Sequence, residues 1–364
     1  MAATSAFAQS SVTLYGIAEA GFGTSNTTGK AAAADNVKTA GLVNGTGNGR
    51  WGIKGTEDIG NGLKANFVAE AQLLIADGTT FDQTAKNQVA NSQQTNVFGA
   101  KTRQTLVGLQ NNLGALNLGY KKGVEQDHND TFNLGFQEAA AGNEFHTAAR
   151  LGRAKGIWYT SPAFGGVTVN VQQSSGSAEY SDAATQAAKQ IDVAITGLSA
   201  LYVNGPLTAG VSYTSGSVDL GTTTASTLDV TNTGTQFAVG KNDYKALGYG
   251  AKYNLGVATV AAQAGKREYG LTTAANLKET KWSQIGVNVP MGNVELIAVY
   301  GKATNYGTDA AEATNVKGHQ MGAKYNFSKR TIGYVYTGKS KTETAASADD
   351  FKVKTVNVGM MHNF

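Results

Sequence analysis

Cysteine is absent from the 364 residues, and proline occurs only 3 times. Without cysteine the chain can form neither a disulfide scaffold nor a thiolate metal site, and it has no thiol nucleophile. Charged residues make up 15% of the chain, whereas soluble domains average about 25%. No run of about 18 apolar residues occurs, which excludes a transmembrane helix. What remains is a long, moderately apolar chain that is poor in charge.

Signals for catalysis and for nucleic-acid binding are also missing. The net charge is only +4 and no basic run occurs, so we expect no nucleic-acid partner. The G-x-S-x-G and H-E-x-x-H motifs do not occur, and the glycine-rich string at 44–49 precedes no helix. We therefore predict a protein that is not an enzyme and that carries no cofactor.

Alternation with a period of two recurs along the chain. In Leu63–Leu73, one face carries Lys64, Asn66, Val68, Glu70 and Gln72, and the other is wholly apolar. A soluble antiparallel sheet gives this pattern, with the apolar face on a core. A membrane barrel also gives it, with the apolar face on lipid and the polar face on a wet lumen. One strand alone does not decide between them.

The lengths of the connections favour the barrel. Seven short turns alternate with eight long polar segments. The turns lie at 57–62, 110–114, 161–166, 204–206, 254–256, 290–292 and 327–330. The long segments lie at 23–49, 76–101, 121–149, 174–189, 217–243, 267–281, 304–317 and 339–350. This order predicts sixteen antiparallel strands with short turns on one rim and long loops on the other.

The two ends of the chain bear on its domain organisation. Ala6-Phe7-Ala8 is an A-x-A cleavage signature, so we interpret residues 1–8 as the remnant of a signal peptide, with an ordinary frayed terminus as the alternative. Residues 9–364 then form a single barrel domain. At the other end, Val356, Val358, Met360, His362 and Phe364 share one face of a strand. We predict that Phe364 serves barrel closure and assembly, because the last strand must pair with the first.

Five segments in order resemble the general porins of Gram-negative bacteria, of the neisserial and β-proteobacterial type. They are 11–16, 50–65 (RWGIKGTEDIGNGLKA), 103–109, 159–166 and the closing His362-Asn363-Phe364. The resemblance implies a trimeric barrel in the outer membrane, whose third long loop folds into the lumen as a constriction. It also implies, as partners, outer-membrane lipid and lipopolysaccharide, small hydrophilic solutes and inorganic ions.

Basic side chains are candidates for the wall of that constriction. Arg50 and Lys54 share a strand face opposite Trp51 and Ile53, and Arg103 opens the fourth strand with Leu106 on the opposite face. The resemblance places constriction arginines at Arg50 and Arg103, with a third near Arg150 or Arg153, where the family pattern is not matched. The predicted basic wall is Arg50, Lys54, Arg103, Arg150 and Arg153.

The predicted third loop, at 121–149, supplies acidic candidates. They are Glu125, Asp127, Asp130, Glu138 and Glu144, accompanied by His128 and His146. Their spacing matches no tight metal-ligand motif, so we predict no metal site. We assign these acids to the negative side of a transverse field, with a solvated external loop as the alternative.

These features predict a general diffusion porin that prefers anions. A channel selective for sugars or organic acids is the main alternative, and it would need an aromatic track along the lumen. An outer-membrane lipase built on a barrel and a soluble β-rich adhesin are weaker alternatives.

Overall fold

The computed structural model describes residues 11–29, 37–76, 96–97, 100–136, 141–143, 151–181, 188–219, 240–271, 278–304, 315–343 and 350–364. These ranges hold one helix, α1 (Val124–Phe132), and eighteen strands. The strands are β1 (Ser11–Gly29), β2 (Lys38–Val43), β3 (Arg50–Gly60), β4 (Leu63–Gln72), β5 (Asn96–Val97), β6 (Ala100–Asn111), β7 (Gly114–Lys122), β8 (Arg153–Thr160), β9 (Val167–Ser181), β10 (Ala188–Asn204), β11 (Leu207–Asp219), β12 (Lys241–Asn254), β13 (Thr259–Leu271), β14 (Lys278–Met291), β15 (Val294–Thr304), β16 (Asn315–Asn326), β17 (Thr331–Glu343) and β18 (Phe351–Asn363).

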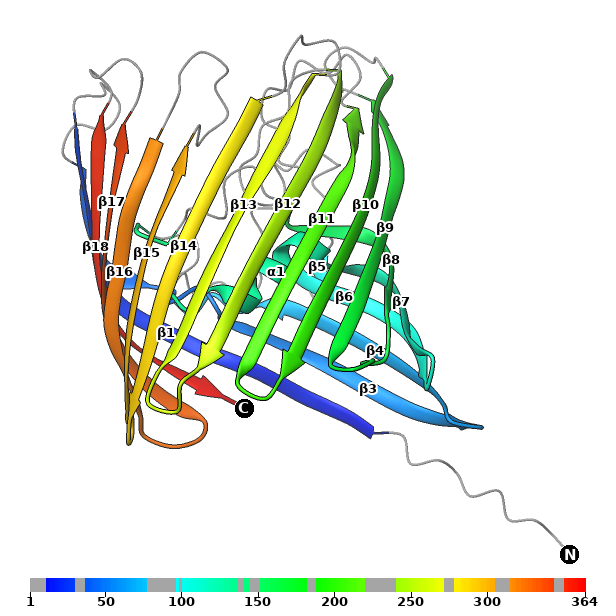
Figure 1. Cartoon of the computed structure of the whole chain (residues 1–364), viewed down its shortest axis with the longest axis horizontal. Coiled ribbons are helices and arrows are strands. Elements are labelled where there is room, and N and C mark those ends of the chain that lie inside the picture. Colours follow the sequence, from blue (N-terminus) through cyan, green and yellow to red (C-terminus); the bar gives the residue numbers. More distant parts are fainter. Residues whose placement is uncertain are drawn as a thin grey trace, which may run out of the picture.

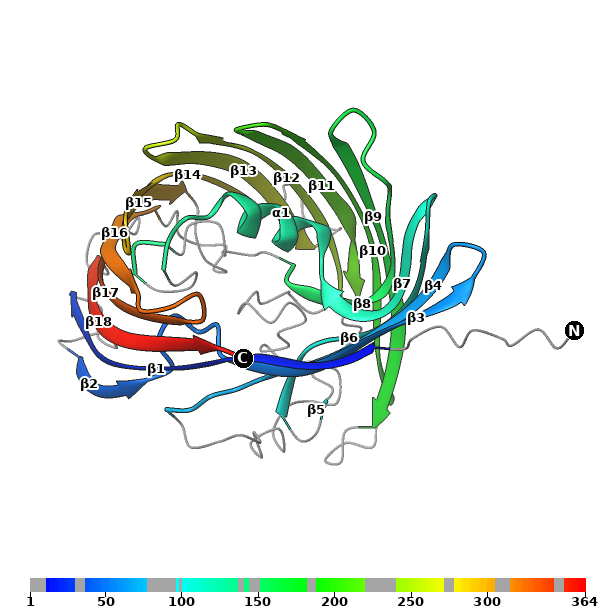
Figure 2. The ribbon, with the colours of Figure 1, turned by 90° about the horizontal axis from the view of Figure 1, so that it is seen from below.

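Sixteen of these strands form a closed antiparallel barrel (Figures 1 and 2). They are β1, β3, β4 and β6–β18, and each pairs with its neighbours along the chain. The ring closes because β1 pairs with β18 from Ile17↔Asn363 to Gly29↔Phe351. The two short strands are additional: β2 pairs with the upper part of β1, and β5 pairs with the start of β6. The predicted strand number is therefore confirmed.

The last residue completes the closing ladder. The backbone N–H of Phe364 donates to the carbonyl of Gly16, and the N–H of Gly16 donates to the carbonyl of Phe364, both at 3.0 Å. A Cβ atom built on Gly16 would lie 2.3 Å from the Phe364 ring and 2.6 Å from the backbone oxygen of Arg50. A glycine at position 16 therefore lets the two strands approach at the point where the ring closes.

Alternation separates two environments along each strand. On β18, Val356, Val358 and Met360 are exposed on the outer surface, whereas Asn357 between them is buried on the inner side. On β1, Phe22 faces outward at 58% exposure and Glu19 faces inward at 1%. The apolar face of the predicted strands thus lies outside the ring. No helix in the described ranges is long and apolar enough to cross a membrane.

All seven predicted short turns connect successive strands at one rim. The β3–β4 turn has the left-handed residue that such a tight bend requires, Asn61 at φ 54°. Several long segments are shorter than predicted, because the hairpin ladders continue into them. β13 runs to Leu271 and β14 begins at Lys278, where we expected a loop from 267. Polar residues continue these strands because the inner face is polar.

The contact between Gly16 and Phe364 gives a test of closure. We expect Gly16→Ala to lower the unfolding temperature of the detergent-solubilised protein, because the new methyl group meets the Arg50 backbone as well as a movable ring. Gly176→Ala is the matched control, since a Cβ atom there meets nothing within 4 Å. Equal unfolding temperatures for the two variants would contradict the assignment of this contact to closure.

Candidate functional site

The chain between β7 and β8, which we call the inner segment, turns into the interior of the barrel and includes α1 (Figure 2). At the turn, the N–H of Gly123 donates to the carbonyl of Gly152 at 2.8 Å. α1 then lies against the inner surface of strands β9–β13. Further along, Phe136 stacks on Tyr336 of β17 with ring centroids 5.0 Å apart, and Asn143 accepts a hydrogen bond from Gln284 of β14. The segment therefore lines the inner wall and narrows the interior from one side.

A buried ion pair anchors α1 to the wall. The Glu125 carboxylate pairs with Arg267 of β13, and it also accepts a hydrogen bond of 2.6 Å from the Tyr244 hydroxyl. The side chains of Glu125 and Arg267 are 5% and 1% exposed. We expected Glu125 to present its charge to the lumen. It faces the wall instead, where Arg267 neutralises it.

Glycines on the wall let α1 approach closely. Phe132 is 1% exposed, and a Cβ atom at Gly250 of β12 would lie 2.6 Å from its ring. At the end of the helix, Lys252 donates to the carbonyl of Thr131 at 3.2 Å. A cation near a helix C-terminus is favourable, because the unpaired carbonyls there carry partial negative charge. The helix is therefore fixed by apolar packing as well as by the buried ion pair.

On the facing wall, two of the predicted basic residues line a hollow of about 430 Å³. Arg50 and Lys54 project inward from β3, on the same side as Tyr15 of the paired strand β1. The Lys54 ammonium lies 5.1 Å from the centre of the Tyr15 ring. Glu70 of β4 enters the same hollow and accepts a hydrogen bond of 3.0 Å from the Tyr15 hydroxyl.

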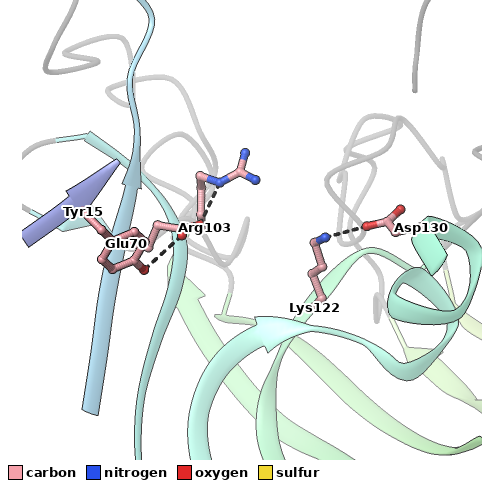
Figure 3. A network of polar contacts seen from close by, with 5 residues as sticks. All are labelled: Tyr15, Glu70, Arg103, Lys122 and Asp130. Carbon is pink, nitrogen blue, oxygen red and sulfur yellow. Dashed lines mark hydrogen bonds and ion pairs between the residues drawn. The ribbon is translucent and has the colours of Figure 1, made fainter. Parts of the chain in front are cut away.

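Arg103 reaches the interior by a route that simple alternation does not predict. Val107 and Leu109 of β6 are exposed on the outer surface, so strict alternation would point Arg103 outward and Leu106 inward. The register shifts between Glu70 and Ala71 of β4, opposite Thr102 and Gln104. This bulge re-aims Arg103, whose Nε donates to Glu70 at 2.9 Å (Figure 3). Leu106 does not lie where we expected it.

Arg153 is the third described arginine of the basic wall, and α1 presents carboxylates to this wall. Arg103 lies close enough to Arg50 and Arg153 for its charge to act on both. On α1, Asp130 pairs with Lys122 at 2.5 Å (Figure 3). The Asp127 side chain is exposed, within electrostatic range of Lys122 and Arg153. Arg150, Glu138, Glu144 and His146 lie outside the described residues.

Sequence reasoning did not single out Glu70 or Arg267. Glu70 stands on the polar face of the Leu63–Leu73 alternation, opposite Gly52 and between the partners of Arg50 and Lys54. That register was a usable signal for a carboxylate among the arginines. Arg267 lay in a segment that we assigned to a loop, so nothing in the pattern placed it on the inner face.

Histidine and metal chemistry contribute little to this site. Burial lowers the pKa of His128 on α1 to about 4, and its ring packs on Phe132 at 5.0 Å. The imidazole is therefore neutral at pH 7 and adds no charge. Among the described residues, no group of three or more histidine or acidic side chains could hold a metal ion.

The glycine-rich string at 44–49 does bind an anionic group, but that group is Glu19 of the same chain. The N–H groups of Thr46 and Asn48 donate to its two carboxylate oxygens at 2.5 and 3.1 Å. Glu19 projects inward from β1 and is 1% exposed. The string joins β2 to β3, so these bonds fix the start of the strand that carries Arg50.

Comparisons with known proteins agree with this architecture. The profile of the Gram-negative porin family matches residues 1–363. The chain belongs to the Gram-negative porin family. It is 26% identical to an outer membrane porin protein of Bordetella pertussis, over 100% of this chain and 96% of that one. It is also 26% identical to outer membrane porin protein 32 of Delftia acidovorans, over 92% of this chain and 84% of that one.

A solved structure shows the same fold. The anion-selective porin from Comamonas acidovorans superposes with a TM-score of 0.73 at 23% identity, over 98% of this chain and 100% of that one. As a porin, this chain resides in the outer membrane of a Gram-negative bacterium, with its short turns toward the periplasm and its long loops outside. The exposed apolar band on the strands then faces lipid.

The anchor of α1 can be tested directly. We expect Glu125→Ala to destabilise the porin by about 3–5 kcal/mol, because the buried guanidinium of Arg267 loses its carboxylate partner. Denaturant unfolding in detergent measures this loss, and noise in single-channel currents would report a loosened segment. Asp130→Ala is the control, since its partly exposed pair with Lys122 is worth about 1 kcal/mol or less. Equal stability of the two variants would refute the anchoring role.

Proposed function

We propose that this porin is a passive, homotrimeric diffusion channel for small hydrophilic solutes and inorganic ions, with a preference for anions. It carries out no chemical step. Its selectivity arises between the basic wall and α1, where the charges of both surfaces act on a passing ion.

The charge balance at this point supports anion preference. Six described cationic side chains lie on the basic wall or between it and the start of α1: Arg50, Lys54, Arg103, Lys121, Lys122 and Arg153. Four described carboxylates lie among them: Glu19, Glu70, Asp127 and Asp130. Glu125 is not counted, because Arg267 neutralises it. The excess is positive, and an excess of one sign on a narrow wall attracts the opposite ion.

Tyr15 lines the hollow beside Arg50 and Lys54, but four other aromatic residues of the interior favour a general channel over a solute-specific one. Tyr244, Trp282, Tyr334 and Tyr336 are each at most 4% exposed. Tyr244 bonds to Glu125 of α1, Tyr336 stacks on Phe136 and packs near Tyr334, and Trp282 packs with Ala303 and Val316. A track that guides one class of sugar would need such rings at the surface of the passage. Their burial supports unselective diffusion of hydrophilic solutes.

Single substitutions with opposite signs test the anion preference. We expect the reversal potential in a KCl gradient to indicate anion preference for the native porin. Arg50→Ser and Arg103→Ser should each reduce it by removing one positive charge. Glu70→Gln should increase it, because Arg103 and Arg50 lose the carboxylate between them.

The control for these recordings is Lys245→Gln, which changes an exposed lysine of β12 outside the basic wall. We expect it to leave the reversal potential unchanged. Cation preference of the native channel, or a shift of the same sign for Glu70→Gln and Arg50→Ser, would overturn the proposal.

A further inference from the structure

The glycine-rich string at 44–49 is a second part of the chain that folds into the interior. It joins β2 to β3, and both of these strands pair with the same edge of β1. Its contacts, however, lie on the other side of β1. Asn357 of β18 donates to the carbonyl of Gly45 at 3.4 Å, and a Cβ atom on Gly45 would overlap the hydroxyl of Tyr334 on β17. The string therefore lies across the inner face of β1 and reaches toward β18 and β17.

Gly21 leaves room for this crossing on β1. It lies on the inner face, two residues after Glu19. A Cβ atom at Gly21 would lie 2.6 Å from Oδ1 of Asn357 and 3.2 Å from the hydroxyl of Tyr334. The bare backbone of β1 at this point therefore lets side chains of β17 and β18 reach the string.

Glu19 holds the string by its backbone. Its two carboxylate oxygens accept hydrogen bonds from the N–H groups of Thr46 and Asn48, at 2.5 and 3.1 Å. The side-chain amide of Asn48 in turn donates to the hydroxyl of Thr46 at 2.8 Å. Hydrogen bonds to a charged acceptor are roughly twice as strong as neutral ones, and Glu19 is only 1% exposed, so water competes little. One buried acid thus fixes the middle of the string.

Tyr334 connects the string with the inner segment. Its hydroxyl lies at Gly45, where a Cβ atom would also lie 2.5 Å from Oε1 of Glu19. Its ring belongs to a buried cluster with Tyr336 and Phe136, and the ring centroids of the two tyrosines are 6.3 Å apart. Phe136 belongs to the inner segment and stacks on Tyr336. The string and the inner segment therefore occupy neighbouring parts of the inner wall.

Together these two parts cover the interior from α1 round to the basic wall. α1 lies against β9–β13, Phe136 lies against β17, and the string continues over β18 and β1. The basic wall follows at once, because Arg50 is the next residue after the string. At this junction the N–H of Leu73 donates to the carbonyl of Gly49 at 3.1 Å. The position of the string therefore decides how the backbone enters Arg50.

We propose that Glu19 is a positioning residue for ion passage. It holds the string against the inner wall as a second boundary of the constriction, and it thereby sets the direction of the Arg50 side chain. This inference rests on the proposed function, because it takes Arg50 as a determinant of anion preference. An acid that acted only through its charge would have the opposite effect on selectivity, since its removal would leave a larger positive excess.

Reversal potentials in a KCl gradient separate position from charge. Glu19→Gln removes the charge and one of the two acceptor oxygens. Gly45→Ala changes no charge, but its methyl group meets Tyr334 and Glu19, and the φ of 58° is unfavourable for alanine. We expect both variants to lower the anion preference, by less than Arg50→Ser does. Gly176→Ala is the matched control, because a Cβ atom there meets nothing within 4 Å, and it should leave the reversal potential unchanged.

Thiol labelling gives a readout that does not depend on ion selectivity. The chain has no cysteine, so a single one can be introduced at Thr46, which is 6% exposed. A charged, membrane-impermeant methanethiosulfonate reagent should leave the current through the Thr46→Cys channel unchanged. When Gly45→Ala is added, the string is displaced, and the reagent should reduce the current in steps. Lys54→Cys, at an exposed position of the basic wall, should react with and without Gly45→Ala.

Opposite results would reject the positioning role. An unchanged or increased anion preference in Glu19→Gln or in Gly45→Ala would contradict it, and so would continued protection of Thr46→Cys beside Gly45→Ala. Circular dichroism in detergent establishes that each variant has formed the barrel. If Gly45→Ala does not fold, labelling of Thr46→Cys in the Glu19→Gln background decides in the same way. Cation preference of the native channel would reject the proposed function, whereas the labelling pattern would still show whether Glu19 holds the string.

Discussion

Backbone hydrogen bonding in a medium without water is the constraint on which this structure depends. In hydrocarbon an unpaired N–H or C=O group costs several kcal/mol, so every strand edge facing lipid must be paired. The reciprocal backbone hydrogen bonds between Gly16 and Phe364 belong to the β1–β18 pairing that removes these strand edges. Once the ring is closed, the pleat sends alternate side chains to lipid and to the lumen. Charge placed on one face therefore acts on solutes, and charge on the other acts on the membrane.

The interior of the barrel imposes a different condition on the inner segment. Solvent competes there for every polar group, so an exposed ion pair would hold the segment weakly. Glu125 and Arg267 instead form a buried ion pair between the helix and the wall, and the Phe132 ring packs closely against Gly250. Because this pair is neutral as a unit, the field that we propose for the passage arises from Arg50, Arg103 and Arg153 on one side and Asp127 and Asp130 on the other. On the same nine-residue helix, Glu125 anchors the segment, whereas Asp127 and Asp130 are the acids that we propose for selectivity.

The ring could be predicted from the sequence more fully than the site. Strand number and turn positions follow from hydrophobic alternation and from turn residues such as Asn61, because both are local in the chain. The direction of Arg103 could not be derived, since it depends on a bulge that only pairing with β4 creates. Glu125 was assigned to the lumen because its partner, Arg267, is 142 residues away. A partner far away in the sequence decides whether a charge is neutralised, and the alternation of side chains along one strand gives no information about such partners.

A modest net charge of +4 conceals two separate positive surfaces. β17 illustrates how one strand serves both faces: Tyr334, Tyr336 and Ser340 are buried on the inner side, while Val335 and Lys339 are exposed on the outer one. The barrel wall is only one strand thick, but Lys339 faces outward while Arg50 of β3 and Arg103 of β6 face the interior. Exposed charges on the two faces point in opposite directions, and charges further apart than the Debye length of about 8 Å at physiological salt are largely screened from each other. Selection on ion passage and selection on lipid contact can therefore proceed at alternate positions of the same strands.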